Sequence, residues 1–277
     1  MGHEKDSLLG KATVYDHDYD PGLLFPLARM EKRARLAIDR DLPFVGEDVW
    51  TAYELSWLNA KGKPQVAIAE FRVPCDSPMM IESKSFKLYL NSLNHKVFVD
   101  HDALVQTLQG DLSAAAGAGV GVRVLPLRPV SMPVGDFAMS GKCIDALDVG
   151  NFVYAPDPDL LSVDIGGDLV EESVYSDLLR SNCPVTGQPD WATVCIHYTG
   201  GRICHESLLR YIVSFRQCQD FHEHCVERIF TDVMTHCRPH SLSVYARYTR
   251  RGGLDINPYR ATPDQSAVAP ALRSVRQ

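Results

Sequence analysis

Val49-Trp-Thr-Ala-Tyr-Glu-Leu-Ser-Trp-Leu58 is rich in the aromatic and β-branched residues that strands prefer. The turn sequence Asn59-Ala-Lys-Gly-Lys-Pro64 follows it, and residues 65–73 predict a second strand, so the two strands form a hairpin. From Ser83 onward the period of the apolar residues changes to that of one helix face, given by Phe86, Tyr89, Leu90 and Leu93. The pattern predicts a hairpin followed by a helix.

The same order of elements returns in the second half of the chain. In the first half, a second helix at 102–114 and a strand at 120–127 complete the unit. In the second half we expect strands at 172–181, 191–198 and 242–249 and helices at 206–217 and 220–236. Hairpins flanking paired helices predict an α+β fold with antiparallel sheets.

This repetition predicts two modules joined by irregular sequence. We place an N-terminal module at 1–130, a linker region at 131–165 and a C-terminal module at 166–277. Residues 261–277 are expected to form a loosely held tail.

The composition is that of an ordinary globular protein. The 277 residues have a formal net charge of −7, which argues against broad binding to nucleic acid or to an anionic membrane. No apolar run is long enough to span a membrane, and the polar N-terminus lacks a secretory signal, so we expect a cytoplasmic protein. None of the eight cysteines forms a Cys-x-x-Cys pair.

The first candidate for chemistry is the loop Ser181-Asn-Cys-Pro-Val-Thr-Gly-Gln-Pro-Asp190, which joins two predicted strands at the surface. The loop is long enough to bring Cys183 and Asp190 together. A thiol beside a carboxyl group suits covalent catalysis, because the sulfur attacks while the acid handles the proton. The alternative is an ordinary cysteine in a turn, with Asp190 capping a strand.

A second candidate is Phe221-His-Glu-His-Cys225, at the start of a predicted helix. His222 shares a helical stripe with apolar residues and therefore points inward, with Glu223 at the edge of that stripe. A buried carboxylate needs a partner, which a ligand with N–H donors would supply. The alternatives are a satisfied core histidine at a helix start, or a zinc site using residues among His222, His224, Cys225, His236 and Cys237.

Two further segments carry cations. Glu82-Ser-Lys-Ser-Phe-Lys87 opens a predicted helix, where lysines and free backbone N–H groups would form an anion cradle; the alternative is a solvated helix start with Ser83 as its N-cap. Arg247-Tyr-Thr-Arg-Arg-Gly-Gly253 ends a strand with glycines that let a backbone approach a ligand closely.

Together these segments resemble the NADPH-dependent 7-cyano-7-deazaguanine reductases, the nitrile reductases of queuosine biosynthesis, in their long two-module form. The resemblance runs from Leu9 to Gln277. Its most specific passages are Tyr53-Glu-Leu-Ser-Trp-Leu-Asn-Ala-Lys-Gly62, Ile81-Glu-Ser-Lys-Ser-Phe-Lys-Leu-Tyr-Leu-Asn-Ser92, Ser181-Asn-Cys183 with Gln188-Pro-Asp-Trp191, Phe221-His-Glu223 with Cys225-Val-Glu-Arg-Ile229, and Leu242-Ser-Val-Tyr-Ala-Arg-Tyr-Thr-Arg-Arg-Gly-Gly-Leu-Asp-Ile-Asn-Pro258.

The resemblance implies two tandem tunnelling-fold modules and a reaction that uses NADPH to reduce the nitrile of 7-cyano-7-deazaguanine to the 7-aminomethyl compound. It implies that Cys183 is the nucleophile that forms a thioimide, and that Asp190 is the proton donor. The positions implied for substrate binding are Ile81, Glu82, Ser83, His222 and Glu223. Those implied for NADPH binding are Ser83, Lys84, Arg251 and Gly252, and no metal is expected.

Tunnelling-fold modules usually close a barrel with partner modules, so the resemblance also implies a homodimer. It implies no direct contact with nucleic acid and none with a membrane. Two alternatives stay open: a zinc-dependent hydrolase of the same fold, similar to the GTP cyclohydrolases, and a non-catalytic protein that binds pterins or purines, because a fold does not fix a function.

Overall fold

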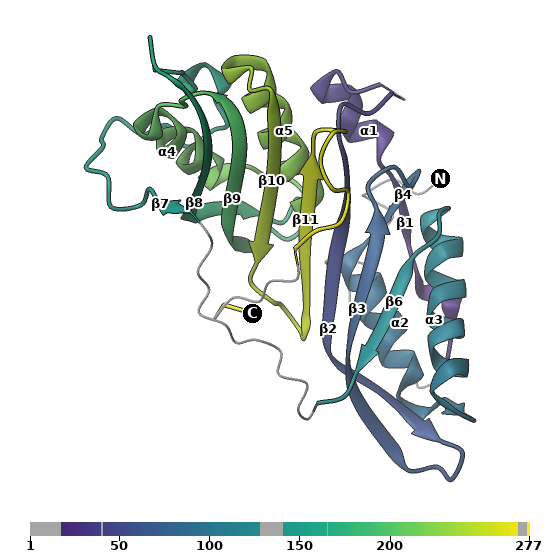
Figure 1. Cartoon of the computed structure of the whole chain (residues 1–277). Helices are drawn as coiled ribbons and strands as arrows, with labels where there is room; N and C mark the ends of the chain where they lie inside the picture. Colours follow the sequence, from purple (N-terminus) through teal and green to yellow (C-terminus); the bar gives the residue numbers. More distant parts are fainter. Residues whose placement is uncertain (1–17, 40, 128–140, 165, 271–275) are drawn as a thin grey trace. The chain divides into compact units, whose positions relative to one another are not determined.

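The computed structural model describes residues 18–39, 41–127, 141–164, 166–270 and 276–277 (Figure 1). These residues fall into two compact units. The first comprises 18–32, 48–127 and 250–255, and the second comprises 33–47, 141–249 and 256–277, each within the described ranges. The expected module limits stay a prediction.

The first unit is built on a long antiparallel hairpin. It consists of β2 (Val45–Asn59) and β3 (Pro64–Pro74), with β6 (Gly121–Leu125) paired antiparallel to β3 and β5 (Val97–Phe98) paired parallel to the end of β2. Strands β1 (Pro26–Ala28) and β4 (Met79–Ile81) form a separate pair. The helices are α2 (Ser83–Ser92) and α3 (His101–Ala116). The core contains Trp50, Phe71 and Phe86, whose rings contact one another through Phe86.

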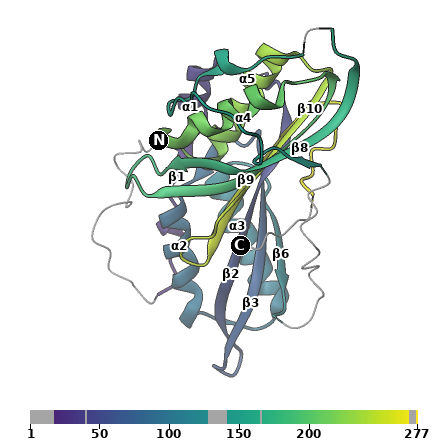
Figure 2. The same cartoon turned by 90° about the vertical axis from the view of Figure 1, so that its left-hand side faces the viewer.

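The second unit repeats this plan. The hairpin of β8 (Leu169–Asn182) and β9 (Pro189–Gly201) is extended by β10 (Ser241–Tyr248) and β11 (Leu254–Ala261), all antiparallel, and the short β7 (Lys142–Cys143) runs parallel to β8. Helices α4 (His205–Ser214) and α5 (His222–Cys237) lie next to each other (Figures 1 and 2). The short α1 (Met30–Arg33) precedes β2 in the chain.

The hydrophobic patterns explain these elements. In β9 the alternating residues Ala192, Val194, Ile196 and Tyr198 are all buried, as the period of a half-buried strand requires. In α2 the residues Phe86 and Tyr89 are buried as the sequence indicated, but Leu90 is only half-buried and Leu88 is buried. The mixed class of helices and antiparallel sheets is therefore confirmed.

Two expectations about the second half are wrong. Residues 254–261 form a further strand, β11, which the sequence did not indicate because Pro258 lies within it. In the described part of the expected tail, 261–270 and 276–277, Ala269 and Gln277 are buried and not loosely held, whereas residues 271–275 lie outside the described residues. Within the expected linker, residues 131–140 lie outside the described residues, and the described part contains β7 and a short 3-10 helix, Pro158–Leu160.

No helix among the described residues is both long enough and apolar enough to cross a membrane.

Candidate active site

The β8–β9 hairpin positions Cys183 and Asp190 at one end of the second unit. Ser181 lies opposite Asp190 in the antiparallel register, and Cys183 follows two residues later. The backbone of Cys183 is fixed on both sides, since its N–H donates to Gln188 O (2.8 Å) and its carbonyl accepts from Gly187 N (3.0 Å). The loop itself is exposed as expected, but the side chains of Cys183 and Asp190 are buried, with residue exposures of 5% and 3%.

The N-terminus of α5 brings His222 to the same hairpin. His222 Nε2 lies 3.3 Å from Asp190 Oδ2, and both side chains are buried. Glu223, the next residue of α5, is also buried, at 1% exposure. The inward orientation expected for His222 is confirmed, and the structure adds a contact that the sequence did not indicate, between the histidine and the predicted proton donor.

Tyr248, the last residue of β10, is a member of this site that sequence reasoning missed. Its ring stacks flat on the imidazole of His222, with the ring centroids 3.6 Å apart and the planes parallel. Burial raises the pKa of the Tyr248 hydroxyl well above its ordinary value, so the phenol is neutral. Alternation along β10 places Tyr248 on one face with Val244 and Ala246, but Tyr245 and Arg247 on the other face are buried as well, so the pattern does not indicate which ring Tyr248 meets.

In the first unit, Glu82 is a helix cap. Its carboxylate accepts from the backbone N–H groups of Lys84 (2.8 Å) and Ser85 (2.7 Å), and its own backbone is extended, as an N-cap requires. Ser83 is therefore the first residue of α2 and not its cap, which corrects one interpretation. The anion cradle is also wrong in part, because a carboxylate already occupies two of the N–H groups that an anion would need.

Arg251 and Gly252 lie in a tight turn of the first unit. Arg251 N donates to Leu254 O (2.9 Å), and the two glycines between them have φ values of 60° and 76°. This is the left-handed backbone that glycine adopts readily in a hairpin turn. A Cβ added at Gly252 would lie 3.5 Å from Lys87 Cδ and 3.8 Å from Lys87 Nζ. The turn therefore lies against the helix that also carries Lys84 and Ser83.

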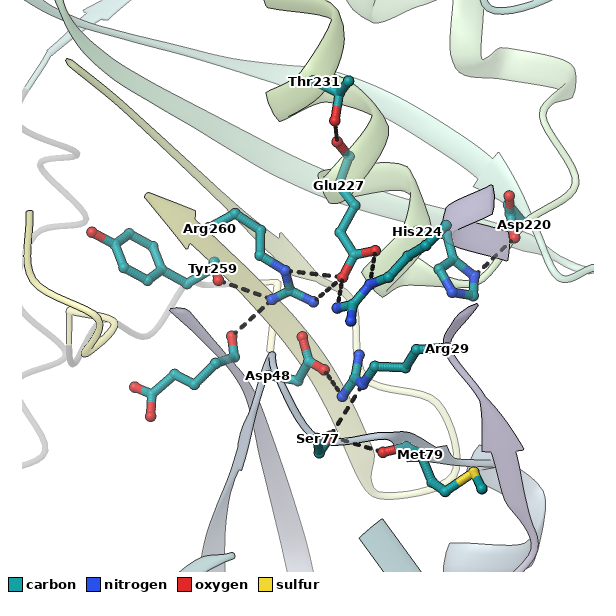
Figure 3. A network of polar contacts seen from close by, with 12 residues as sticks. Arg29, Asp48, Ser77, Met79, Asp220, His224, Glu227, Thr231, Tyr259 and Arg260 are labelled. Carbon is teal, nitrogen blue, oxygen red and sulfur yellow. Dashed lines mark hydrogen bonds and ion pairs between the residues drawn. The ribbon is translucent and has the colours of Figure 1, made fainter. Parts of the chain in front are cut away.

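Further along α5 than His222, Glu227 takes part in a buried charge network that holds the helix in place. Glu227 binds Arg33 through both carboxylate oxygens (2.6 and 3.0 Å) and binds Arg260 through Oε1 (2.8 Å to Nη2), and all three side chains are buried. Figure 3 shows this network, with Thr231 donating to the Glu227 carbonyl. Burial alone would raise the pKa of Glu227, but Arg260 and Arg33 outweigh it and hold that pKa well below its ordinary value.

The possible zinc ligands are not gathered around one point. His222 faces Asp190, whereas His224 Nδ1 lies 3.3 Å from Asp220 Oδ1. Within the described ranges no group of three or more His, Cys, Asp or Glu side chains has the geometry to hold a metal ion.

Comparison with known proteins places these residues in a family context. Residues 15–124 match the family described as "Nitrile reductase, 7-cyano-7-deazaguanine-reductase N-term", and residues 189–267 match the family described as "QueF-like protein". A protein of Azoarcus sp. (strain BH72) named NADPH-dependent 7-cyano-7-deazaguanine reductase is 54% identical over 277 residues, which cover 98% of this chain and 95% of that protein.

A protein with the same name from Burkholderia ambifaria is 56% identical over 265 residues, covering 94% of each chain. Among solved structures, that of the archaeosine synthase QueF-Like in the apo form is 19% identical, with a TM-score of 0.30, and the match covers 37% of this chain and 96% of that one.

Proposed function

Because the chain belongs to the NADPH-dependent 7-cyano-7-deazaguanine reductase family, we propose that it reduces the nitrile of 7-cyano-7-deazaguanine to the amine of 7-aminomethyl-7-deazaguanine, in queuosine biosynthesis. The observation that carries the assignment of residues is the buried group formed by the hairpin and α5, in which His222 contacts Asp190 next to the turn that holds Cys183.

Cys183 is the nucleophile. Its sulfur adds to the nitrile carbon, and the nitrile nitrogen takes up a proton, so that a C–S bond forms, one C–N π bond is lost and a thioimide results. Asp190 receives the thiol proton and delivers it to that nitrogen, which requires the acid to be held close to the attacking sulfur. The antiparallel register and the two backbone hydrogen bonds of Cys183 support such a placement.

His222 and Glu223 bind the substrate beside this pair. The carboxylate of Glu223 accepts N–H groups from the guanine-like edge in a charge-assisted contact. His222 Nδ1 is buried and has no hydrogen-bond partner among the described residues, so it is available for a polar atom of the substrate. Ile81, Glu82 and Ser83, at the start of α2, are the substrate-binding positions of the first unit.

The residues proposed for NADPH fit an anionic cofactor. Ser83, Lys84, Arg251 and Gly252 come from the start of α2 and from the glycine turn that packs against Lys87 of the same helix. Their cations would bind phosphate groups, and the absent Cβ of Gly252 leaves room beside the Lys87 ammonium. NADPH bound there would supply the two hydrides of the reduction, one to the thioimide carbon and one to the imine formed when Cys183 leaves as a thiol, with one proton taken up at nitrogen each time.

During these steps the chain must protect the imine from water. The buried positions of Cys183, Asp190 and Glu223 favour such exclusion. The wider proposal includes two tunnelling-fold modules per chain, a homodimer and a cytoplasmic location. Size-exclusion chromatography with light scattering tests the homodimer.

The function is tested by mixing the purified chain with NADPH and 7-cyano-7-deazaguanine and following NADPH absorbance. We expect about two NADPH consumed per nitrile, one for each hydride step. No consumption would reject the reductase. Bound zinc together with the absence of a covalent substrate adduct, checked by intact-protein mass spectrometry, would favour the hydrolase alternative.

A further inference from the structure

At the end of β10, side-chain hydrogen bonds take over from the backbone pairing between β10 and β11. The paired residues run from Ser243 opposite Ala261 to Tyr245 opposite Tyr259. Further along β10, both backbone groups of Tyr248 are bound by side chains instead: its N–H donates to Asn257 Oδ1 (3.0 Å), and its carbonyl accepts from Gln277 Nε2 (3.2 Å). Buried backbone groups need such partners, so these two side-chain amides take the place of backbone partners from β11, while Tyr248 stays paired with Ala192 of β9.

Gln277 is held firmly where it makes this contact. Its Nε2 also donates to Asn257 Oδ1 (2.8 Å), which closes a ring of hydrogen bonds with the Tyr248 backbone. Its Oε1 accepts from Arg247 Nε (2.9 Å) and Nη2 (2.6 Å), and Arg247 Nη1 donates to the Tyr245 hydroxyl (2.7 Å). Gln277 and Arg247 are 7% and 4% exposed. The buried amide of Gln277 therefore acts both as a hydrogen-bond donor, through Nε2, and as an acceptor, through Oε1.

The residue fixed in this way is the one that stacks on His222. The Tyr248 ring lies 3.6 Å from the imidazole, and the same imidazole places Nε2 3.3 Å from Asp190 Oδ2. A shift of the Tyr248 backbone would move its ring, and the imidazole would lose the surface that sets its plane. A change of about 1 Å in a catalytic group lowers the rate by up to roughly a hundredfold.

We propose that Gln277 is a positioning residue of the active site, acting through Tyr248 and His222 to orient Asp190. The Gln277 amide binds the backbone carbonyl of Tyr248 at the end of β10. The inference rests on the proposed function for its effect on turnover, but its geometric part concerns the stacking of Tyr248 on His222 and can be measured without turnover.

The experiment compares Gln277→Ala, Gln277→Glu and the matched control Ser266→Ala, a change at an exposed residue of the same segment. Glu at this position keeps an oxygen acceptor for Arg247 but presents an oxygen to two acceptors, Tyr248 O and Asn257 Oδ1. A residue that only ties down the segment would tolerate Glu, whereas a residue that positions Tyr248 would not.

We expect kcat to fall about tenfold to a hundredfold in both Gln277 variants. KM should rise by less than kcat falls, because His222 is one of several groups proposed to contact the substrate and the others keep their places. Ser266→Ala should match the wild type. Adding Tyr248→Leu to Gln277→Ala should lower kcat little further than Tyr248→Leu alone, because residues acting in one chain of contacts are not additive.

A second readout is independent of the reaction. In protein with labelled histidines, the His222 ring protons should be shifted upfield by the Tyr248 ring, and His222→Gln assigns them by their loss. Both Gln277 variants should lose that shift. Wild-type kcat together with a retained upfield shift in Gln277→Glu would overturn the proposal. If the wild type consumes no NADPH, the reductase assignment fails while the histidine signals still decide the positioning role.

Discussion

The helix pairs of the two units share the same internal contacts. In the first unit, Tyr89 of α2 donates to Asp111 of α3 at 2.6 Å; in the second, Tyr211 of α4 donates to Asp232 of α5 at the same distance. Ser85 and Ser207 also match, since each hydroxyl donates to the backbone of its own helix cap and accepts an N–H from a distant segment. These contacts support a duplicated frame that both units use for stability.

The hairpins differ at the positions that we propose for catalysis. Asn59 at the end of β2 makes the same two kinds of backbone hydrogen bond across its turn as Cys183 does. Its N–H donates to Lys63 O, and its carbonyl accepts from Gly62 N. Its side chain serves only the turn, accepting from Lys61 N and Lys63 N. β3 and β9 both begin with proline, but the next residue is Gln65 in the first unit and Asp190 in the second. One frame therefore carries a structural turn in one unit and a thiol with an acid in the other.

The helix starts differ in a complementary way. α3 and α5 both begin with histidine and an acid, yet the side chains of His101 and Asp102 are 56% and 89% exposed, whereas His222 and Glu223 are buried. The first helices of the two pairs differ as well. The side chain of Glu82 caps the N-terminus of α2, whereas the side chain of Cys204, the N-cap residue of α4, makes no capping hydrogen bond. The two units therefore share a frame and differ in a few residues at the hairpin and helix ends, where the proposed site lies.

The strongest way to break this comparison is to exchange the two hairpin residues. Cys183→Asn gives the second unit the residue of the first, and we expect turnover to fall by at least about 10⁴-fold, because the proposed nucleophile is lost. Asn59→Cys should leave kcat within about twofold, since Gln65 stands in the first hairpin where Asp190 stands in the second. The measurement is NADPH consumption with 7-cyano-7-deazaguanine. Substantial turnover in Cys183→Asn would mean that the thiol is not the nucleophile.

The next largest effect concerns buried charge. Glu227→Gln leaves Arg33 and Arg260 buried without their carboxylate, and we expect a loss of about 3–5 kcal/mol in the free energy of unfolding. The buried pair chosen for comparison in the first unit is Asp48 with Arg29, at 2.6 Å, and we expect Asp48→Asn to cost less than Glu227→Gln. Urea denaturation followed by circular dichroism measures both. An equal or larger loss in Asp48→Asn would contradict this order.

Much of the fold could be predicted because its signals are local. The alternation in β9 and the helical face of α2 depend only on nearby residues, and both were sufficient. The cap of α2 was assigned one residue late, because serine is a preferred cap and glutamate is not. β11 was missed for a similar reason, since a proline within a run argues against a strand.

The site was only partly predictable because its contacts are long-range. The sequence indicated that His222 points inward and that Cys183 and Asp190 share a loop. It did not indicate that His222 meets Asp190, because α4 lies between them in the chain and only the packing of α5 on β10 brings them together. Gln277 carries no local signal at all, since its partners Arg247, Tyr248 and Asn257 are distant in sequence.

A smaller effect separates the two tyrosine–aspartate pairs. Tyr211→Phe removes a bond to a carboxylate, and we expect a loss of about 1.5–3 kcal/mol in the free energy of unfolding. Tyr89→Phe should be less costly, because Asp111 also accepts from the Tyr19 hydroxyl at 2.6 Å. Paired urea denaturation curves provide the comparison. The reverse order would indicate that Tyr19 does not support Asp111 in solution.

The smallest expected effect is a change in acid sensitivity within the second unit, of at most about 1.4 kcal/mol per pH unit for each proton. The pKa of Glu227 is lower in the folded state than its ordinary value of 4.5. Glu227 therefore stabilises the fold at pH values above 4.5, and this stabilisation is lost as the pH falls toward the folded-state pKa.

The contribution of Asp232 to the free energy of unfolding depends on pH in the opposite direction. Burial raises its pKa above 3.8, despite the hydrogen bond from Tyr211, so its contribution is present at low pH and is lost as the pH rises. Glu227→Gln should therefore flatten the decline in unfolding free energy between about pH 5 and 3, whereas Asp232→Asn should steepen it. Urea midpoints measured across that range decide the matter, and slopes that change in the same direction in both variants would contradict the opposite signs assigned to these two carboxyl groups.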